Sequence, residues 1–383
     1  MPRRAFVVVI DACGAGAAPD AALYGDEGAN TLGHLAEHLG GLRLPNLQRL
    51  GLGSILPLAG VAPARDPALH GLLCPTGPGK DSTAGHWELM GIVAARRPPT
   101  YPNGFPPEVI ELVRSVSGRE VICNRVDNGL DAIAQFGAEQ LRTGALIVYT
   151  SQDSVLQIAA HVDVLAPEQL YEVCAGVRRA LRGEHAIGRV IARPFEGVDG
   201  SFSRTDGRRD YALAPPGAGY LDALRARGVE VHAVGKVAQL FAGAGFDVEH
   251  PAPSNAPALR WVSELIDTLD GGLVFANLIE TDQVYGHRHD FEGFARALEA
   301  IDGSVGRWLA ALRDGDLLVL TADHGCDPAS PRTDHTRELV PLLAIFPGHG
   351  GRRHDGTLPD VGASVMRWLT GDDDPALPGA PFL

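Results

Sequence analysis

The sequence lacks paired cysteines and long apolar runs. Its five cysteines are scattered over 383 residues without a Cys-x-x-Cys pair, and the odd number argues against a disulfide framework. No apolar run approaches the roughly 20 residues that a membrane helix needs. The apolar stretch near the N-terminus stops at Asp11 with no small-residue cleavage site after it, which predicts a strand and not a signal peptide. We therefore expect a cytoplasmic protein without a membrane partner.

Positive charge is also scarce. The chain carries 33 lysines and arginines against 47 aspartates and glutamates, which gives a formal net charge of −14. This charge opposes the phosphates of nucleic acids, so we expect no nucleic-acid partner. Any phosphate that the protein handles should belong to a small ligand, held by a local cation or a metal.

The pattern of apolar segments predicts an α/β protein with an insertion. At 383 residues the chain exceeds a usual single core. Strands predicted at 5–10, 229–234 and 273–279 alternate with helices, as in an open, doubly wound sheet. Pro-rich stretches near 96–107 and 214–217 mark an inserted unit. We expect a core domain at 1–95 and 214–383 and an inserted domain at 96–213. Residues 30–39 predict a helix capped by Asn30, and residues 42–58 a connector with few regular elements.

Acidic and imidazole side chains follow the predicted core strands. Asp11 ends the first strand, and Asp323 and His324 follow the apolar run at 317–321. Parallel sheets bind ligands beyond the carboxyl ends of their strands, so these residues are expected to share a cation. His335 is a third candidate from the next loop. Mixed carboxylate and imidazole ligation suits Mn²⁺ or Zn²⁺ better than Ca²⁺.

A second pair of candidate ligands follows another strand. Asp282 and His287 lie five residues apart on the loop after 273–279. Each such residue alone could be a helix cap or a solvated loop residue. Together the six candidates at strand ends favour two metals, which can stabilise both ends of a phosphoryl displacement.

The stretch 77–91 predicts a hydroxyl at the start of a helix. A Gly-Pro-rich loop leads through Lys80 and Asp81 to Ser82 and Thr83. Backbone N–H groups at a helix start favour an anion, and a metal beside the hydroxyl would make it nucleophilic. The alternative is that Ser82 or Thr83 only caps the helix. The spacing of a P-loop is absent.

The inserted unit is rich in arginine. Most such side chains are solvated, but a subset facing a cleft would recognise a substrate phosphate through paired N–H donors. The candidates are Arg125, Arg189, Arg193, Arg204, Arg208 and Arg209.

Several blocks together resemble the phosphopentomutases of the alkaline phosphatase superfamily. The resemblance spans nearly the whole chain, in order. The blocks are F-V-V-V-I-D, G-K-D-S-T-A-G-H-W-E, Y-T-S-Q-D-S-V-L-Q-I-A-A-H, G-R-V-I-A-R-P-F, G-H-R-H-D, T-A-D-H-G-C-D-P and D-H-T-R-E-L-V-P-L-L. The resemblance implies an alkaline-phosphatase-like core with an inserted α/β cap and two metals, usually Mn²⁺. It also implies a small phosphosugar substrate, with ribose or deoxyribose 1- and 5-phosphates interconverted and a sugar bisphosphate priming the phosphoenzyme.

The resemblance also implies roles for single residues. The implied nucleophile is Ser82, at a position where the family usually has threonine, and Thr83 is the next candidate. Lys236 of the core is expected to face the sugar-phosphate pocket. The implied ligands are Asp11, Asp323 and His324 for one metal and Asp282, His287 and His335 for the other. The implied pocket residues of the cap are Ser151, Asp153, Arg189, Ile191 and Arg204.

The chain departs from the family pattern at three places. Residues 123–132, which include the cap loop expected at 124–132, differ from the usual G-N-K-P-A-S-G-T-E-I block. Glu280 stands for a usual aspartate and Cys326 for a usual asparagine. None of these is an implied ligand, so the identity of the preferred pentose is what they put in question. Two other functions are weighed beside the mutase. They are a metal-dependent phosphatase or phosphodiesterase on the same core and a metal-binding scaffold without turnover.

Overall fold

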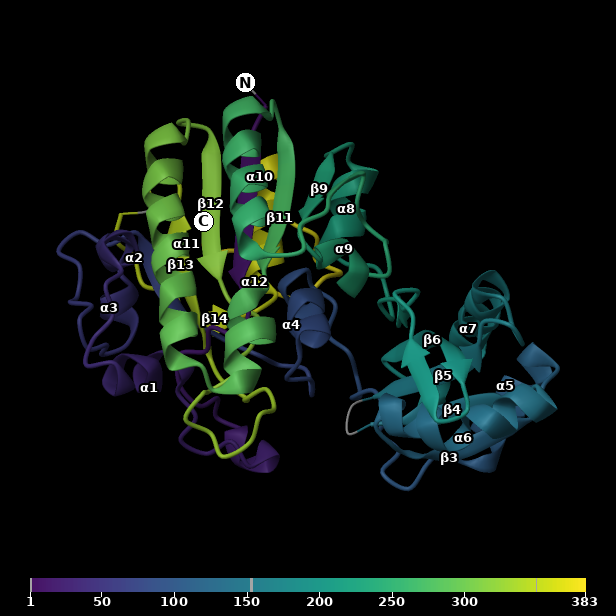
Figure 1. Cartoon of the computed structure of the whole chain (residues 1–383). Coiled ribbons are helices and arrows are strands. Elements are labelled where there is room, and N and C mark those ends of the chain that lie inside the picture. Colours follow the sequence, from purple (N-terminus) through teal and green to yellow (C-terminus); the bar gives the residue numbers. More distant parts are fainter. Residues whose placement is uncertain (1, 152–153, 349) are drawn as a thin grey trace. The chain divides into compact units, whose positions relative to one another are not determined.

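The computed structural model describes residues 2–151, 154–348 and 350–383 (Figure 1). Its contacts divide the chain into two compact units. One comprises Met1–Arg96 with Pro215–Leu383, and the other comprises Arg97–Ala214. Each unit has its own sheet and helices.

The first unit is built on an eight-stranded mixed sheet. Its order is β10-β9-β11-β1-β12-β13-β2-β14, and the strands from β10 to β12 run parallel. β13 is antiparallel to both β12 and β2, and β14 is parallel to β2. The strands are β1 (Arg4–Ile10), β2 (Leu69–Cys74), β9 (Val231–Val234), β10 (Val248–His250), β11 (Gly272–Leu278), β12 (Asp316–Thr321), β13 (Val340–Ile345) and β14 (Gly356–Thr357). The predicted α/β fold is confirmed, and the turn to antiparallel pairing at β13 is added by the structure.

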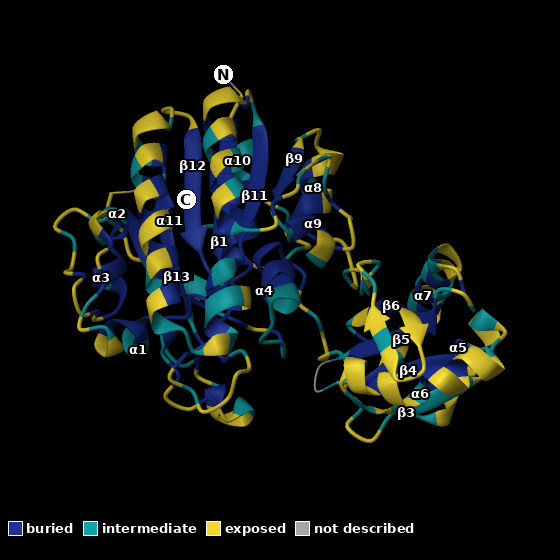
Figure 2. Cartoon of the chain, in the orientation of Figure 1, coloured by how far each residue is buried: buried dark blue, intermediate teal, exposed yellow. Residues whose placement is uncertain are grey.

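The central strands are apolar because both of their faces are covered. Every residue of β1, β11 and β12 is buried (Figure 2). Helices α10 and α11 lie side by side along the sheet, while α12 packs on β1, β11 and β12. The helices of this unit are α1 (Thr31–His38), α2 (Pro45–Leu50), α3 (Leu52–Ile55), α4 (Ser82–Leu89), α8 (Tyr220–Ala226), α9 (Val237–Leu240), α10 (Asn255–Thr268), α11 (Phe291–Ala311) and α12 (Asp360–Thr370). No helix in the described part of the chain is long and apolar enough to cross a membrane.

The region of α1 to α3 shows one correct and one wrong expectation. Asn30 caps α1 by accepting a hydrogen bond from the Gly33 N–H, as predicted. The stretch 42–58 was expected to be irregular, but it holds two short helices. Pro45 stands in the first turn of α2, where its missing N–H costs nothing, and Gly51 ends α2 at a positive φ of 112°.

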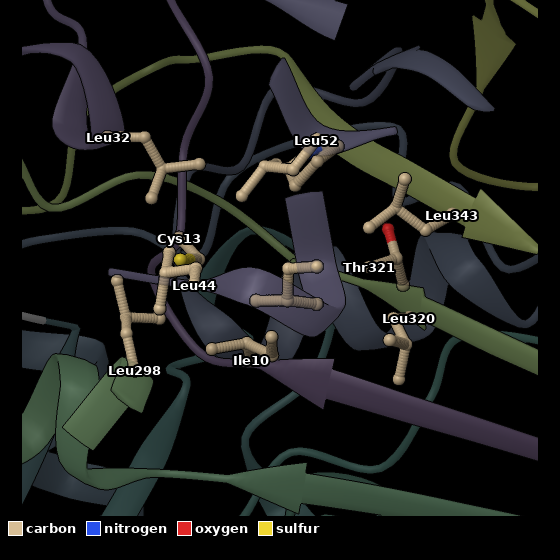
Figure 3. A pocket seen from close by; sticks show the side chains of 11 residues that line it. Ile10, Cys13, Leu32, Leu44, Leu52, Leu298, Leu320, Thr321 and Leu343 are labelled. Atoms are coloured by element: carbon tan, nitrogen blue, oxygen red, sulfur yellow. The ribbon is translucent and has the colours of Figure 1, made fainter. Parts of the chain in front are cut away.

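A small apolar cavity of about 20 Å³ lies between these helices and the sheet (Figure 3). Ile10 and Leu320 line it from β1 and β12, Leu32 from α1 and Leu298 from α11. This volume has room for about one water molecule, and its lining is almost wholly apolar, so the cavity is a packing defect and not a ligand site.

The second unit is built on a six-stranded sheet. Its order is β3-β4-β5-β6-β7, with β8 also paired to β6. Alternate residues of β4 point to opposite faces: Val148 packs among residues of α5 (Pro107–Ser117) and α7 (Pro167–Ala180), and Tyr149 packs against α6 (Gly129–Thr143). The strands are β3 (Val121–Val126), β4 (Leu146–Thr150), β5 (Val155–His161), β6 (Arg189–Val198), β7 (Ser201–Arg204) and β8 (Arg209–Ala212).

Candidate metal centre

The first group of candidate ligands lies at the carboxyl ends of two neighbouring strands. β1 and β12 are parallel, with Val9 opposite Thr321, so the residues that follow them meet at one edge of the sheet. His324 Nε2 lies 3.4 Å from Asp11 Oδ1 and 3.3 Å from Asp323 Oδ2. All three side chains are buried, and their ligand atoms lie within 4.8 Å of one another.

The second group is centred on Asp282, which follows β11 in a single π-helical turn, Thr281–Tyr285. Its Oδ1 lies 3.4 Å from His287 Nε2 and 3.3 Å from His335 Nε2. The ring of His335 is also 4.3 Å from the ring of His324, centroid to centroid. The six predicted ligands are thus brought into one continuous cluster, with His324 and His335 between its two halves.

The cluster has the polar atoms that a cation would satisfy. Asp282 Oδ1, Asp323 Oδ2 and His335 Nε2 are buried, and none has a hydrogen-bond partner among the described residues. Their neighbours lie 3.1–3.4 Å away but are not oriented to form hydrogen bonds. Buried polar atoms left unpaired cost free energy, so this arrangement fits a divalent cation at each half.

Outer contacts orient the imidazole rings. His287 Nδ1 lies 2.6 Å from the Thr333 carbonyl oxygen, and His324 Nδ1 lies 3.0 Å from the Gly325 carbonyl oxygen. Each Nδ1 therefore donates to a carbonyl oxygen, which leaves each Nε2 as the nitrogen that would bind a cation. On the carboxylate side, Asn277 Nδ2 donates to Asp11 Oδ2 over 2.9 Å.

Burial and mutual charge shift the pKa values within the cluster. Burial, with the charge of Asp323 second, raises the pKa of Asp11 to about 6. The contact with Asp282 raises the pKa of His287 to about 11. For Asp282 itself, burial acts to raise the pKa, but the contacts with His287 and His335 outweigh it and the net shift is downward. The cluster holds protons that a cation must displace, so metal binding here is coupled to proton release.

Ser82 is the first residue of α4 and faces the first group of ligands. Its Oγ lies 3.3 Å from Asp11 Oδ1 and 3.1 Å from His324 Nε2. The helix is capped by Asp81, whose side chain accepts a hydrogen bond from the Ala84 N–H over 3.1 Å. Capping, the alternative role weighed for Ser82 and Thr83, is therefore performed by the residue before them.

Two residues that the sequence does not assign to the site, Lys80 and Glu88, hold the loop before Ser82. Lys80 Nζ lies 3.1 Å from Asp26 Oδ2 and 3.0 Å from Asp334 Oδ2, which links this loop to the residue before His335. Glu88 Oε1 accepts hydrogen bonds from the N–H groups of Thr76 and Gly77. The Lys80 contacts join segments far apart in the sequence, and the Glu88 contacts depend on the turn of α4. No local sequence pattern predicts either.

Cys326 is a further residue near the second group. Its Sγ lies 3.8 Å from His287 Nδ1, and it could form a metal-binding set with Asp282 and His287. The sequence marked it only as a departure from the family pattern. The thiol lies on the Nδ1 side of His287, which also faces Thr333, whereas Asp282 lies on the Nε2 side.

In the second unit, three of the predicted pocket residues share one face of the sheet. Ile191 is opposite Gln157, which is opposite Tyr149, and Arg189 lies two residues from Ile191 on the same strand. Arg204 reaches this face too, because a Cβ on Gly129 would lie 2.2 Å from its Nη2 and 2.3 Å from Tyr149 Oη. Ser151 follows β4 directly, and Asp153 lies outside the described residues.

Lys236 belongs to the first unit. Its Nζ lies 2.6 Å from Gln283 Oε1, and Gln283 is the residue after Asp282. The second group of ligands and this lysine are therefore joined through one short turn.

The divergent segment 124–132, expected to form a loop, is mostly regular structure. β3 extends to Val126, Asn128 caps α6, and the helix begins at Gly129. Arg125 Nε donates to Asp127 Oδ2 over 2.8 Å. The charge that Asp127 adds is therefore paired within the same segment.

The similarity to known proteins covers nearly the whole length of the chain. A family model for the Metalloenzyme superfamily matches residues 3–372. The chain is 45% identical to a phosphopentomutase of Caldanaerobacter subterraneus subsp. tengcongensis, over 95% of this chain and 94% of that protein. It is 48% identical to one of Syntrophotalea carbinolica, over 90% and 88%.

Solved structures share the fold at much lower sequence identity. The PH0037 protein of Pyrococcus horikoshii aligns with a TM-score of 0.50 at 16% identity, over 98% of both chains. A phosphoglycerate mutase of Leishmania mexicana aligns with a TM-score of 0.50 at 13% identity, over 100% of this chain and 97% of that one.

Proposed function

This chain belongs to the phosphopentomutases within the metalloenzyme superfamily, and we propose that it interconverts pentose 1- and 5-phosphates through a phosphorylated Ser82. The observation that carries the proposal is the position of Ser82 Oγ, 3.3 Å from Asp11 Oδ1 and 3.1 Å from His324 Nε2. Asp81 caps the helix, so the Ser82 hydroxyl is not needed for capping. It lies beside a buried cluster of metal-type ligands, where it is suited to nucleophilic attack on phosphorus.

The proposed cofactors are two divalent cations, which we assign as Mn²⁺, and a sugar bisphosphate activator. Asp11, Asp323 and His324 would hold one cation, and Asp282, His287 and His335 the other. When bound, the cations supply positive charge that stabilises the transferring phosphoryl group and lowers the pKa of the hydroxyl.

The proposed reaction of Ser82 is a sequence of phosphoryl transfers. In priming, the Oγ–P bond forms as a P–O bond of the sugar bisphosphate breaks, and the proton of the Ser82 hydroxyl ends on the sugar oxygen that leaves. The phosphoserine then transfers its phosphoryl group to the free hydroxyl of a pentose monophosphate, which yields a pentose bisphosphate. The second phosphoryl group of that bisphosphate returns to Ser82, and the isomeric monophosphate leaves.

In the cap, the proposed substrate residues are Ser151, Asp153, Arg189, Ile191 and Arg204, with Lys236 in the core. Arginine is suited to the phosphate that is not being transferred, because its planar guanidinium donates two parallel hydrogen bonds to one anion. A mutase must also keep water from the phosphoserine while the bisphosphate reorients in the site. We propose that the inserted cap serves to exclude this water.

The proposal is tested by ³¹P NMR of the purified protein with Mn²⁺, a trace of sugar bisphosphate and ribose 5-phosphate. We expect the ribose 1-phosphate signal to grow to equilibrium, and the same mixture to form from ribose 1-phosphate. Steady accumulation of inorganic phosphate instead would identify a phosphatase on the same core and would contradict the mutase assignment.

A further inference from the structure

His86 is a fully buried histidine that neither half of the metal cluster uses. It lies on α4 four residues after Ser82, so its side chain lies on the same face of the helix as Ser82. Its ring packs beside Phe275 of β11, with 5.6 Å between the ring centroids. The His86 side chain is thus a polar group with no exposed surface, on the helix of Ser82 and beside the sheet that carries the candidate ligands.

The contacts of His86 are made by one nitrogen. Nδ1 lies 2.8 Å from the carbonyl oxygen of Ser82 and 3.1 Å from Asp323 Oδ2. Nε2 is buried and has no hydrogen-bond partner in the part of the chain that the structure describes. The proton of the ring is therefore assigned to Nδ1, where it lies between the backbone of the nucleophile and a carboxylate of the first metal group.

The neighbouring residue fixes how closely the helix approaches. A Cβ on Gly85 would lie 2.4 Å from the Asp323 carbonyl oxygen and 2.7 Å from its Cβ, so α4 packs directly on the Asp323 backbone. The other oxygen of Asp323, Oδ1, accepts a hydrogen bond from the Ala12 N–H over 3.1 Å. With Oδ1 held by the turn that follows β1 and Oδ2 beside His86, the orientation of Asp323 depends on α4.

We infer that His86 is a positioning residue: its Nδ1–H donates to the Ser82 carbonyl oxygen, and the same edge of the ring faces Asp323 Oδ2 as an electrostatic contact and not as a hydrogen bond. Metal affinity and attack by Ser82 would then depend on the same side chain. The part of this inference that concerns attack rests on the proposed function of Ser82, whereas the part that concerns Asp323 does not. Loss of an outer contact to a metal ligand typically lowers metal affinity or activity by about 10–100-fold. A nucleophile displaced by about 1 Å loses activity on a similar scale.

Three variants separate this role from simple filling of space. In His86→Asn the side-chain amide nitrogen is as many bonds from Cα as Nδ1 is. In His86→Gln the same group is as many bonds away as Nε2, where the structure shows no partner among the described residues. His86→Leu removes the donor altogether. For each variant we would measure Mn²⁺ affinity by competition with a chromophoric chelator, phosphorylation by intact mass after incubation with sugar bisphosphate, and mutase rate.

We expect His86→Asn to stay within about threefold of the unaltered protein, and His86→Gln and His86→Leu to lose about tenfold or more in affinity at one of two Mn²⁺ sites. Phosphorylation should slow in the same two variants. Unaltered Mn²⁺ affinity and phosphorylation in His86→Gln would overturn the inference, and so would an equal loss in Asn and Gln. If His86→Leu does not fold, the comparison of His86→Asn with His86→Gln tests the inference by itself. If the unaltered protein has no mutase activity but the Gln variant still loses Mn²⁺ affinity, the proposed function fails and the role of His86 stands.

Discussion

At the scale of single residues, capping of α4 and the role of nucleophile fall to two different residues, Asp81 and Ser82. Asp81 caps α4 through the Ala84 N–H, and Ser82 stands one position later with its hydroxyl at Asp11 and His324. A one-residue shift in this register would turn the hydroxyl away, since successive residues of a helix point about 100° apart.

We therefore expect Ser82→Ala to abolish phosphoryl transfer while the fold and the bound metals persist. The reason is that a covalent mechanism has no other nucleophile at this position. Thr83→Ala is the matched control and should keep most of the activity. The measurement is intact mass after incubation with sugar bisphosphate. A phosphoryl adduct on Ser82→Ala and none on Thr83→Ala would show that the register is wrong by one.

The second residue-scale prediction concerns the metal ligands. Asp282→Asn or His335→Ala should lower the bound metal from two ions to about one and the activity by orders of magnitude, since both cations stabilise one transition state. Metal content is read by elemental analysis of the dialysed protein. Lys80→Met serves as a control that changes a nearby charge without removing a proposed ligand. Two ions retained in both ligand variants would contradict the two-metal assignment.

At the scale of elements, β1 and β12 are joined at the edge opposite the metal centre by a buried ion pair. Arg4 donates to both carboxylate oxygens of Asp316, and its Nη1 also donates to the carbonyl oxygens of Ile266 and Leu269 at the end of α10. Both side chains are almost wholly buried. Removal of one partner leaves an uncompensated buried charge.

We expect Asp316→Ala to lower the free energy of unfolding by about 3–5 kcal/mol, measured by urea denaturation. Because the pair lies at the far ends of these strands from Asp11 and Asp323, the folded fraction should keep the unaltered Mn²⁺ stoichiometry. Arg353→Ala is the matched control: its pair with Asp355 is about half exposed, so the expected loss is about 0–1 kcal/mol. Similar losses in both variants would remove the special role assigned to the buried pair.

The connection between β3 and α6 is where we expect the pentose preference of the enzyme to be altered. Arg125 and Asp127 neutralise each other there, and Leu130 is 51% exposed at the start of α6. A site that pairs a substrate hydroxyl rejects analogues that lack it more strongly than an apolar pocket discriminates size. We expect a narrowed or displaced pentose preference relative to the family.

This preference is measured as kcat/KM for ribose, 2-deoxyribose and arabinose 5-phosphates. The comparison is between the unaltered chain and a variant with Lys, Ala, Ser and Thr restored at positions 125, 127, 128 and 130. Equal substrate ratios in the two proteins would exclude this segment as a determinant of specificity, whatever the absolute rates.

At the scale of the whole molecule, cations bound by the cluster should stabilise the first unit, because the unfolded chain does not bring its ligands together. Removal of metal with a chelator should lower the Tm of this unit. Each cation present at 100 times its Kd adds about 2.7 kcal/mol.

The effect should depend on pH in a defined direction. A raised pKa of about 11 keeps His287 protonated at neutral pH until a cation displaces the proton, so protons compete with metal. Affinity for Mn²⁺ should therefore rise from pH 6 to pH 8, and the Tm difference between the metal-loaded and chelated protein should widen. Titration calorimetry measures the affinity and scanning calorimetry measures the Tm difference at the two pH values. A Tm difference that is the same at pH 6 and pH 8 would contradict proton-linked binding.

The sequence alone determined the α/β class and most of the core strands, because buried parallel strands are apolar runs whose ends are marked by glycine and charge. It also placed all six candidate ligands, since Asp11, Asp282 and Asp323 each follow such a run. Local patterns can do this because strand ends are local. The helices at 45–55 were missed, and there the signal was only a proline and a glycine between leucines.

The tertiary structure decided what depends on residues far apart in the chain. The antiparallel insertion of β13 between β12 and β2 has no local signature. Nor do the contacts of Lys80 with Asp26 and of His86 with Asp323, because each joins segments that meet only after the sheet has formed. The division of tasks between Asp81 and Ser82 belongs here too: the sequence supplied adjacent candidates, and only the packing of α4 on the Asp323 backbone decided which of them faces the metal centre.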